Sequence, residues 1–274
     1  MRAAAAVAAA LLLSVVLPAT ATGYSRRGGY IVDGAPRGGN ITYAAGLPLV
    51  NYNGSWHRNP VTISQYGLWM HKRWRQTHAR SDVHGALRAA RWLVSHQRLG
   101  VWRYDFPYKS AGMTETLQPG WFSAMAQGQA MSLLVRAYYI TGHTTFLQVA
   151  RRALWPFSVP VPQGVLGNLD GPWYEEYPSA HPTHVLNGFM FSLLGLYDLA
   201  PYSTKAARLY REGRGSLLRA LPRFDGPGIS RYDLAVLASK TYNHVHVVEL
   251  RVLDSINPTP VLRFWAARFA SYDK

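Results

Sequence analysis

The chain has 274 residues, 48% of them hydrophobic and 16% charged, so it can bury a full core and lacks the composition of a disordered protein. Lys and Arg number 29 against 14 Asp and Glu, a formal net charge of +15 that favours an acidic partner. The absence of cysteine excludes disulfides and thiolate metal sites.

The first residues have the order of features found in an export signal. Arg2 is followed by an apolar run over 3–17, a helix-breaking Pro18 and small residues. This pattern predicts a signal peptide over 1–21, cut after Ala21, and a secreted or exported mature protein. Because the run is short for a bilayer span, an uncleaved membrane anchor is the weaker alternative. Export favours an acidic polysaccharide or anionic lipid, and not nucleic acid, as the partner of the basic chain.

Residues 22–58 are predicted to form a small β-rich lead-in. Their apolar stretches, 30–32 and 47–50, are short and bounded by turn residues, as in two or three short strands with irregular connections. Pro48 has no backbone N–H, so we expect its strand to lie at the edge of a sheet. The rest of the chain, 59–274, is the predicted main domain.

From about residue 64 the hydrophobic pattern becomes helical. Ser81 and Asp82 are placed to cap an amphipathic helix. The apolar side chains that recur on one face of this helix are Val83, Leu87, Ala90 and Val94.

Two later segments, 123–139 and 184–199, are apolar nearly all round, which is typical of helices covered on most sides. Each is followed by a more amphipathic helix, at 145–154 and 205–221. The positions that match between the two inner helices are Gly128, Ser132, Leu133 and Leu134 in the first and Gly188, Ser192, Leu193 and Leu194 in the second. This self-similarity predicts stacked helical hairpins. The expected fold is mainly α, an incomplete α/α toroid with a small β-rich N-terminal segment.

Three tyrosine-bearing segments fall at predicted loops or helix ends, and a toroid collects such loops at one mouth. They are WYEEYPS at 173–179, ISRYDL at 229–234 and TYNHVHVVEL at 241–250. The alternative for Glu175 and Glu176 is a solvated pair, since paired acids usually face water. His244 and His246 are two residues apart, but further ligands are not evident, so no metal site is predicted.

Several of these motifs, taken together and in order, carry a resemblance. They are ISQYGL at 63–68, GWFSAMAQGQAMSLLVRAY at 120–138, WYEEYPS, HVLNGFMFSLLGLYDL at 184–199, YDL and Y-x-x-x-H. From about residue 59 to its end the chain resembles the C-terminal domain of the D-glucuronyl C5-epimerases of heparan sulfate biosynthesis. The resemblance implies a partly open α/α barrel that inverts C5 of D-glucuronate within a heparosan-like polysaccharide, giving L-iduronate without a redox cofactor.

The resemblance also implies site residues. By position, the catalytic glutamate of the family and the tyrosine beside it fall on Glu176 and Tyr177, and two later active-site tyrosines fall on Tyr232 and Tyr242. His246 matches the histidine of Y-x-x-x-H and is expected to bind substrate.

Arginines near the mouth are expected to bind the uronate carboxylate. A proton α to a carboxylate is weakly acidic, and its removal needs positive charge or hydrogen bonds at that carboxylate. Arg103 in WRYDFPY and Arg231 are the candidates, and each is equally compatible with a solvated surface charge. The YDLR of the family reads YDLA here, so Ala235 stands where an arginine is expected.

Inversion needs proton transfer on both faces of the sugar ring. Glu176 and Tyr242 are predicted to be the opposed pair, with Tyr177 and Tyr232 orienting the substrate or relaying protons. Tyrosine has an ordinary pKa of about 10, so it acts as a base near neutral pH only if cations lower that pKa.

Two other functions fit the sequence. A uronate polysaccharide lyase on the same scaffold would begin with the same C5 proton abstraction and then expel the C4 substituent. A non-catalytic exported module that binds acidic glycans would need only the high arginine content. All three readings predict an acidic uronate-containing polysaccharide as partner, and a homodimer is compatible with each.

Overall fold

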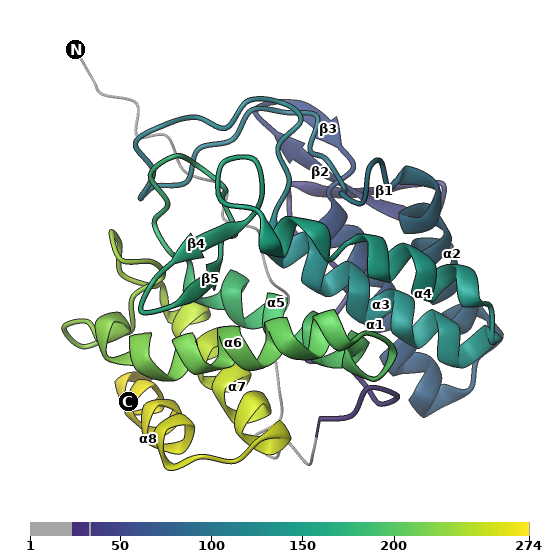
Figure 1. Ribbon diagram of the computed structural model, residues 1–274. Helices are drawn as coiled ribbons and strands as arrows, with labels where there is room; N and C mark the ends of the chain where they lie inside the picture. Colours follow the sequence, from purple (N-terminus) through teal and green to yellow (C-terminus); the bar gives the residue numbers. More distant parts are fainter. Residues whose placement is uncertain (1–23, 33, 274) are drawn as a thin grey trace.

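The computed structural model describes residues 24–32 and 34–273, so the predicted signal peptide at 1–21 lies outside the described residues (Figure 1). The strands are β1 (Ile41–Ala44), β2 (Leu47–Tyr52), β3 (Ser55–His57), β4 (Leu166–Asn168) and β5 (Pro172–Tyr174). The α-helices are α1 (Pro60–Thr77), α2 (Arg80–His96), α3 (Ala124–Thr141), α4 (Thr144–Arg152), α5 (Leu186–Leu199), α6 (Thr204–Ala220), α7 (Lys240–Ile256) and α8 (Pro260–Ala270). The prediction of a mainly helical protein with a small N-terminal sheet is confirmed.

The helices pack as consecutive pairs. Contacts join α1 to α2, α3 to α4, α5 to α6 and α7 to α8, and α1, α3, α5 and α7 also contact one another in that order. In Figure 1 the three-stranded sheet lies at the top and α7 and α8 lie at the bottom. The antiparallel sheet has the order β1-β2-β3, and β4 pairs with β5 in a separate two-stranded sheet.

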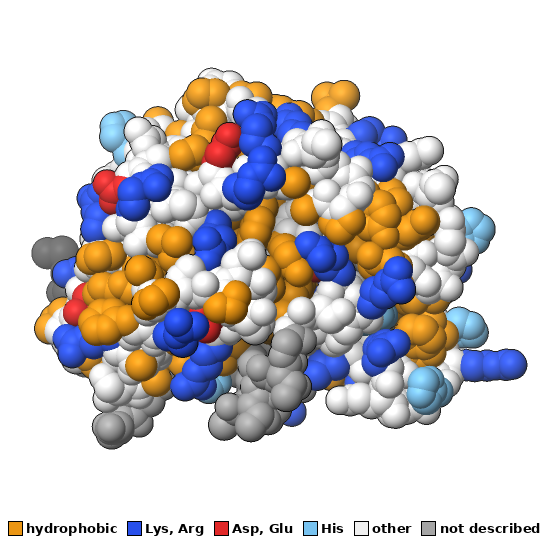
Figure 2. All heavy atoms as spheres, turned by 60° about the horizontal axis from the view of Figure 1, so that its bottom comes forward, with side chains coloured by type: hydrophobic (Ala, Val, Ile, Leu, Met, Phe, Trp, Pro, Cys, Tyr) orange, Lys and Arg blue, Asp and Glu red, His pale blue; other side chains and the backbone are white. Residues whose placement is uncertain are grey.

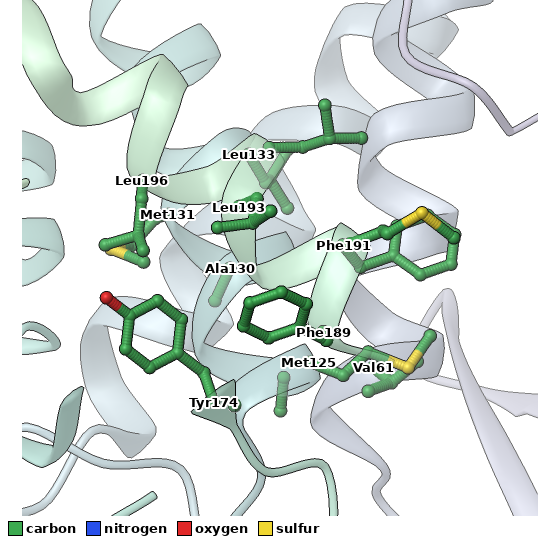
Figure 3. Close-up of a cluster of buried hydrophobic side chains, with 14 of the residues drawn as sticks. Val61, Met125, Ala130, Met131, Leu133, Tyr174, Phe189, Phe191, Leu193 and Leu196 are labelled. Carbon is green, nitrogen blue, oxygen red and sulfur yellow. The ribbon is translucent and has the colours of Figure 1, made fainter. Parts of the chain in front are cut away.

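Helices α3 and α5 form the centre of the core, because small residues allow their backbones to approach closely. A Cβ at Gly128 would overlap the backbone of Phe191 and Ser192, and one at Gly195 would overlap the backbone of Gly128. Figure 3 shows the apolar side chains around this contact. Those labelled are Val61, Met125, Ala130, Met131, Leu133, Tyr174, Phe189, Phe191, Leu193 and Leu196, all buried. The expectation that both segments are covered helices is confirmed.

Two local predictions are wrong. Helix α2 begins at Arg80 after Ala79, and Asp82 lies within its first turn, where its Oδ2 accepts a hydrogen bond from Thr77 Oγ1 at 2.9 Å. The acid therefore joins α2 to the end of α1 and does not cap α2. Pro48 lies in the central strand β2, but β3 pairs only with residues 50–52, so no described strand flanks Pro48 on that side. Its missing N–H thus costs no ladder hydrogen bond there.

A buried ion pair joins α3 to α5 at the far end of these helices from Glu176. Arg136 Nη1 lies 2.6 Å from Asp198 Oδ2, and both side chains are fully buried. The same carboxylate oxygen accepts from Tyr24 Oη at 2.7 Å, and Arg136 also donates to the carbonyls of Ser25 and Gly28. These contacts hold the segment before the first sheet against the helical core.

Lys and Arg side chains are spread over the face in Figure 2, where Asp and Glu are fewer. Within residues 24–32 and 34–273, no helix is long and apolar enough to cross a membrane.

Candidate active site

The WYEEYPS segment follows β5 and is held by backbone hydrogen bonds on both sides. Glu175 N–H donates to Val165 C=O at 2.8 Å, and Glu175 C=O accepts from Ala124 N–H at the start of α3 at 3.1 Å. Both glutamates are buried, at 1% and 2% exposure. The alternative of a solvated acid pair is therefore wrong. The cause is tertiary, because α3, α5 and the loops before them cover this segment.

Glu175 is engaged in a structural contact. Its Oε1 lies 2.6 Å from His184 Nδ1, and Gly167 on β4 leaves room for the carboxylate. Burial raises the pKa of Glu175, while the hydrogen bond from His184 acts in the opposite direction. This acid therefore ties the segment to the turn that precedes α5.

Glu176 has the environment of a general base or acid. Burial raises its pKa to about 7, with a smaller contribution from the nearby negative charge of Asp233. Its Oε2 has no hydrogen-bond partner among the described residues. A Cβ at Gly188 on α5 would overlap that oxygen, so only glycine leaves it room. A carboxyl with a pKa near 7 can both accept and return a proton at neutral pH.

Tyrosines from separate parts of the chain meet beside Glu176. Tyr177 Oη lies 3.1 Å from Tyr232 Oη and 3.4 Å from Tyr108 Oη. The rings of Tyr232 and Tyr242 are in edge contact, with their centroids 4.8 Å apart. We call Tyr108, Tyr177, Tyr232 and Tyr242 the tyrosine cluster. Three of its members were predicted from the sequence, and the structure brings them together.

Burial raises the pKa of every hydroxyl in this cluster. The pKa of Tyr108 rises to about 12, and those of Tyr177, Tyr232 and Tyr242 rise well above 10. The negative charge of Glu176 adds to the shift in all four. A tyrosine acts as a base near neutral pH only if nearby cations lower its pKa. The described surroundings act the other way, so neutral phenols that donate protons are favoured.

Local hydrogen bonds fix the loop that carries Tyr232. Its C=O accepts from Leu186 N–H at the start of α5, and its N–H donates to Val236 C=O. Asp233 Oδ1 accepts from the N–H groups of Ala235 and Val236, both at 2.8 Å, which closes the turn. The tyrosine is thereby joined to the helix whose Gly188 faces Glu176.

Helix α7 supplies Tyr242 in its first turn, after the N-cap Ser239. His246, one turn further on, is fully buried, with its Nδ1 2.8 Å from Ser230 Oγ. Burial lowers the pKa of His246 to about 3, so its ring is neutral. The described contacts of His246 support the loop bearing Tyr232, whereas the resemblance suggested substrate binding.

The two arginines predicted to bind substrate differ in exposure and in their contacts. Arg103 is exposed, donates from Nη1 to Gly120 C=O at 2.5 Å, and lies over the Phe122 ring. Arg231 is half-buried, and its N–H donates to Phe224 C=O. Among the described contacts, neither guanidinium reaches the tyrosine cluster. In the described ranges, no three His, Asp or Glu side chains come together as a metal-binding group.

Comparison with known proteins identifies the family of this chain. The model of the D-glucuronyl C5-epimerase C-terminus matches residues 96–271. The D-glucuronyl C5-epimerase of Caenorhabditis elegans is 36% identical over 214 residues, which are 69% of this chain and 35% of that protein. The chain belongs to the D-glucuronyl C5-epimerase family. It spans about a third of the length of this curated relative.

This epimerase-family chain is also similar to two further proteins, one in sequence and one in fold. An uncharacterized protein of Methanocaldococcus jannaschii is 33% identical over 159 residues, or 55% of this chain and 50% of its own length. A solved structure of a UGL variant with dGlcA-Glc-Rha-Glc has a TM-score of 0.52 at 18% identity, covering 76% of this chain and 60% of that one. The second match concerns the fold alone.

Sequence reasoning about this epimerase-family chain missed several site residues. Tyr108 ends the motif WRYDFPY, from which only Arg103 was predicted to be a site residue. Tyr52 of β2 stacks on Phe106 at 4.0 Å, and its ring lies 6.4 Å from that of Tyr108. Glu249 is fully buried on α7, and neither of its carboxylate oxygens has a partner among the described residues. Its position three residues after His246, on an apolar helix, was the available signal.

Proposed function

We propose that this protein is a polysaccharide uronate C5-epimerase, which converts D-glucuronate to L-iduronate within an acidic, heparosan-like polymer on an incomplete α/α toroid. Family membership supports the reaction class. The single observation that carries the proposal is the buried Glu176, with a pKa of about 7, beside hydrogen-bonded tyrosines from three separate loops or helix ends.

The proposed first step breaks the C5–H bond of the glucuronate. Glu176, ionised at neutral pH in a large fraction of molecules, accepts the proton, and the electron pair passes to the sugar carboxylate. That carboxylate gains negative charge in a site with little water, so donated hydrogen bonds stabilise it strongly. The proposed donors are the hydroxyls of Tyr177 and Tyr232, which lie 3.1 Å apart.

The second step returns a proton to C5 from the opposite face. A phenol whose pKa is raised by burial is neutral and holds a proton to give, which suits Tyr242 as donor. The resulting tyrosinate is reprotonated through the neighbouring hydroxyls as Glu176 loses the proton that it gained. The net change is inversion at C5 without net gain or loss of protons by the protein.

We also propose the division of the chain predicted from the sequence, with a signal peptide at 1–21, a lead-in at 22–58 and the catalytic domain at 59–274. The lead-in serves the site in this proposal, because Tyr52 accepts a hydrogen bond from Asn59 Nδ2 at 2.7 Å and stacks on Phe106. Mass spectrometry of the exported protein would find a start near Thr22. Recovery of an intact N-terminus would instead support a membrane anchor.

Hydrogen exchange at C5 tests the proposed reaction. A heparosan polymer incubated with the protein in heavy water should gain deuterium at C5 and some iduronate, without unsaturated ends and without shortening. Tyr242→Phe and Glu176→Gln should abolish or greatly reduce inversion while polymer binding remains. Tyr210→Phe is the matched control, because it removes a buried hydroxyl that bonds to Asn257 away from the cluster.

Other outcomes would favour the alternatives. Unsaturated products would identify a lyase. Polymer binding without exchange under any condition would leave the non-catalytic module, and full activity in both site variants would show that other residues transfer the protons.

A further inference from the structure

We propose that an arginine-lined hollow beside the candidate active site is an accessory subsite, which binds one anionic sugar unit of the polymer outside the reacting position. This inference rests on the proposed function, because it names how the same substrate is held. The hollow has a volume of about 250 Å³, below the range of drug-sized pockets and suited to a single sugar unit. Its lining residues are Arg58, Trp92, His96, Arg98, Trp102, Arg103 and Asp105.

The charge of the hollow is positive and largely uncompensated. Three arginines line it, and in the part of the chain that the structure describes none of them has a carboxylate partner. Its acid, Asp105, is engaged at 2.9 Å with His57 Nδ1. An anion entering the hollow therefore meets guanidinium groups that lack a carboxylate counter-charge.

Two of these guanidinium groups keep donors for a ligand. Arg98 uses Nη1 to donate to the carbonyls of Ser95 and Gln97, and Arg103 uses Nη1 to donate to Gly120 C=O. Both side chains are exposed. A planar guanidinium with a free edge matches the paired oxygens of a carboxylate or sulfate group.

Arg58 differs from Arg98 and Arg103 because both of its terminal nitrogens donate to backbone carbonyls. Its two terminal nitrogens donate to the carbonyls of Ala44, Leu47 and Pro48, which brace the turn between β1 and β2. It contributes positive charge to the hollow while holding the sheet in place. A variant at Arg58 would therefore disturb the fold, and Arg98 is the better position for a test.

A flat aromatic surface accompanies the charges. The rings of Trp92 and His96 stack with centroids 4.3 Å apart and an angle of 14° between their planes. Both residues line the hollow. His96 covers one face of the Trp92 indole, and the part of this stacked pair that lines the hollow is an apolar surface with one N–H donor at its edge. Such a surface suits the C–H face of a pyranose ring and its outlying hydroxyls. Charge alone would attract any anion, and the aromatic surface favours an anionic sugar.

The hollow is joined to the tyrosine cluster through Arg103 and its neighbour. The ring of Tyr104 stacks on Trp121 at 3.8 Å, and Trp121 lies 6.2 Å from Tyr177. The backbone pairs as well, since Tyr104 N–H donates to Trp121 C=O at 2.9 Å. One chain segment thus contributes a guanidinium to the hollow and a ring to the aromatic wall that contacts Tyr177, and in this proposal a single polymer occupies both sites.

The test compares Arg98→Ala with Arg91→Ala, which removes the same charge from an exposed position on α2 that does not line the hollow. Trp92→Leu is the second variant, because it removes the aromatic surface without changing the charge. Substrates are glucuronate oligosaccharides of increasing length, with and without sulfate groups. Binding is measured by calorimetry and turnover by deuterium incorporation at C5.

For long oligosaccharides, Arg98→Ala and Trp92→Leu should each raise Kd and KM about threefold to fivefold, as expected for one exposed charged or stacking contact. Their kcat should be unchanged, and turnover of the shortest substrate should equal that of the wild type. A larger effect with sulfated chains would assign the site to sulfate, and an equal effect with both would assign it to carboxylate.

Three outcomes would overturn the subsite. They are wild-type behaviour of both variants on long substrates, equal weakening by Arg91→Ala, or equal losses on short and long substrates. If the wild type binds oligosaccharides without exchanging C5 hydrogen, the proposed function fails and the calorimetric comparison still decides the subsite. If it binds none of them, both are overturned.

Discussion

Ionisation of Glu176 should make the folded protein less stable as pH rises, and Glu176→Gln should remove that part of the pH dependence. The Glu176 side chain is 2% exposed, and its Oε2 has no hydrogen-bond partner among the described residues. Gly188 packs so closely against this oxygen that a Cβ there would overlap it. Burial raises the pKa of Glu176 from 4.5 to about 7. Each pKa unit corresponds to about 1.4 kcal/mol, so ionising this side chain in the folded state costs about 3 kcal/mol.

The sign follows from which state loses its proton first. Below pH 4.5 Glu176 is protonated in both states, and its full contribution to stability is present. Between pH 4.5 and 7 the unfolded chain releases the proton while the folded chain keeps it, so the free energy of unfolding falls. Above pH 7 both states are ionised, and this loss is complete.

Denaturant unfolding at pH 4.5 and pH 8 measures the effect. Between these two pH values the free energy of unfolding of the wild type should fall by about 3 kcal/mol more than that of Glu176→Gln. Burial also raises the pKa of Glu249, but that residue is present in both proteins, so the comparison isolates Glu176. Glu212→Gln, at an exposed acid on α6, is the control and should follow the wild type. An equal pH dependence in the wild type and Glu176→Gln would refute the raised pKa of the buried Glu176 carboxyl.

Three other predictions follow from packing and charge. Gly188→Ala places a methyl group against Glu176 Oε2. It should lower the free energy of unfolding by about 1–3 kcal/mol and remove most of the C5 exchange activity. Thermal unfolding and turnover equal to those of the wild type would contradict the close approach of Gly188 to Glu176. Asp198→Asn leaves Arg136 buried without its carboxylate and should cost about 3–5 kcal/mol in denaturant unfolding. Asp254→Asn, in a more exposed pair, should cost less than about 1 kcal/mol, and similar costs for the two variants would show that burial is not decisive. Binding to heparosan should weaken as ionic strength rises, because salt screens the attraction between a protein of net charge +15 and an anionic polymer. An affinity that does not depend on salt would count against an electrostatic contribution.

Sequence alone was sufficient for the features that depend on local pattern. The all-round apolar character of 123–139 and 184–199 predicted covered helices, and α3 and α5 are covered on nearly all sides. The order of motifs along the chain was sufficient for the family. Helical periodicity and motif order are properties of neighbouring residues, so they can be read without knowing what packs against them.

Features that depend on distant residues required the tertiary structure. Glu175 and Glu176 look like a solvated pair in the sequence, and only the packing of α3 and α5 around them shows that they are buried. The direction of the pKa shifts in the tyrosine cluster was also hidden, because desolvation depends on every atom that surrounds a hydroxyl. Arg103 could not be placed from its motif, since its neighbour Tyr104 faces the aromatic wall while its own guanidinium lines the separate hollow. The sequence by itself determined which groups this protein brings to its chemistry, and the tertiary structure decided their protonation and grouping, because both depend on contacts between residues far apart in the chain.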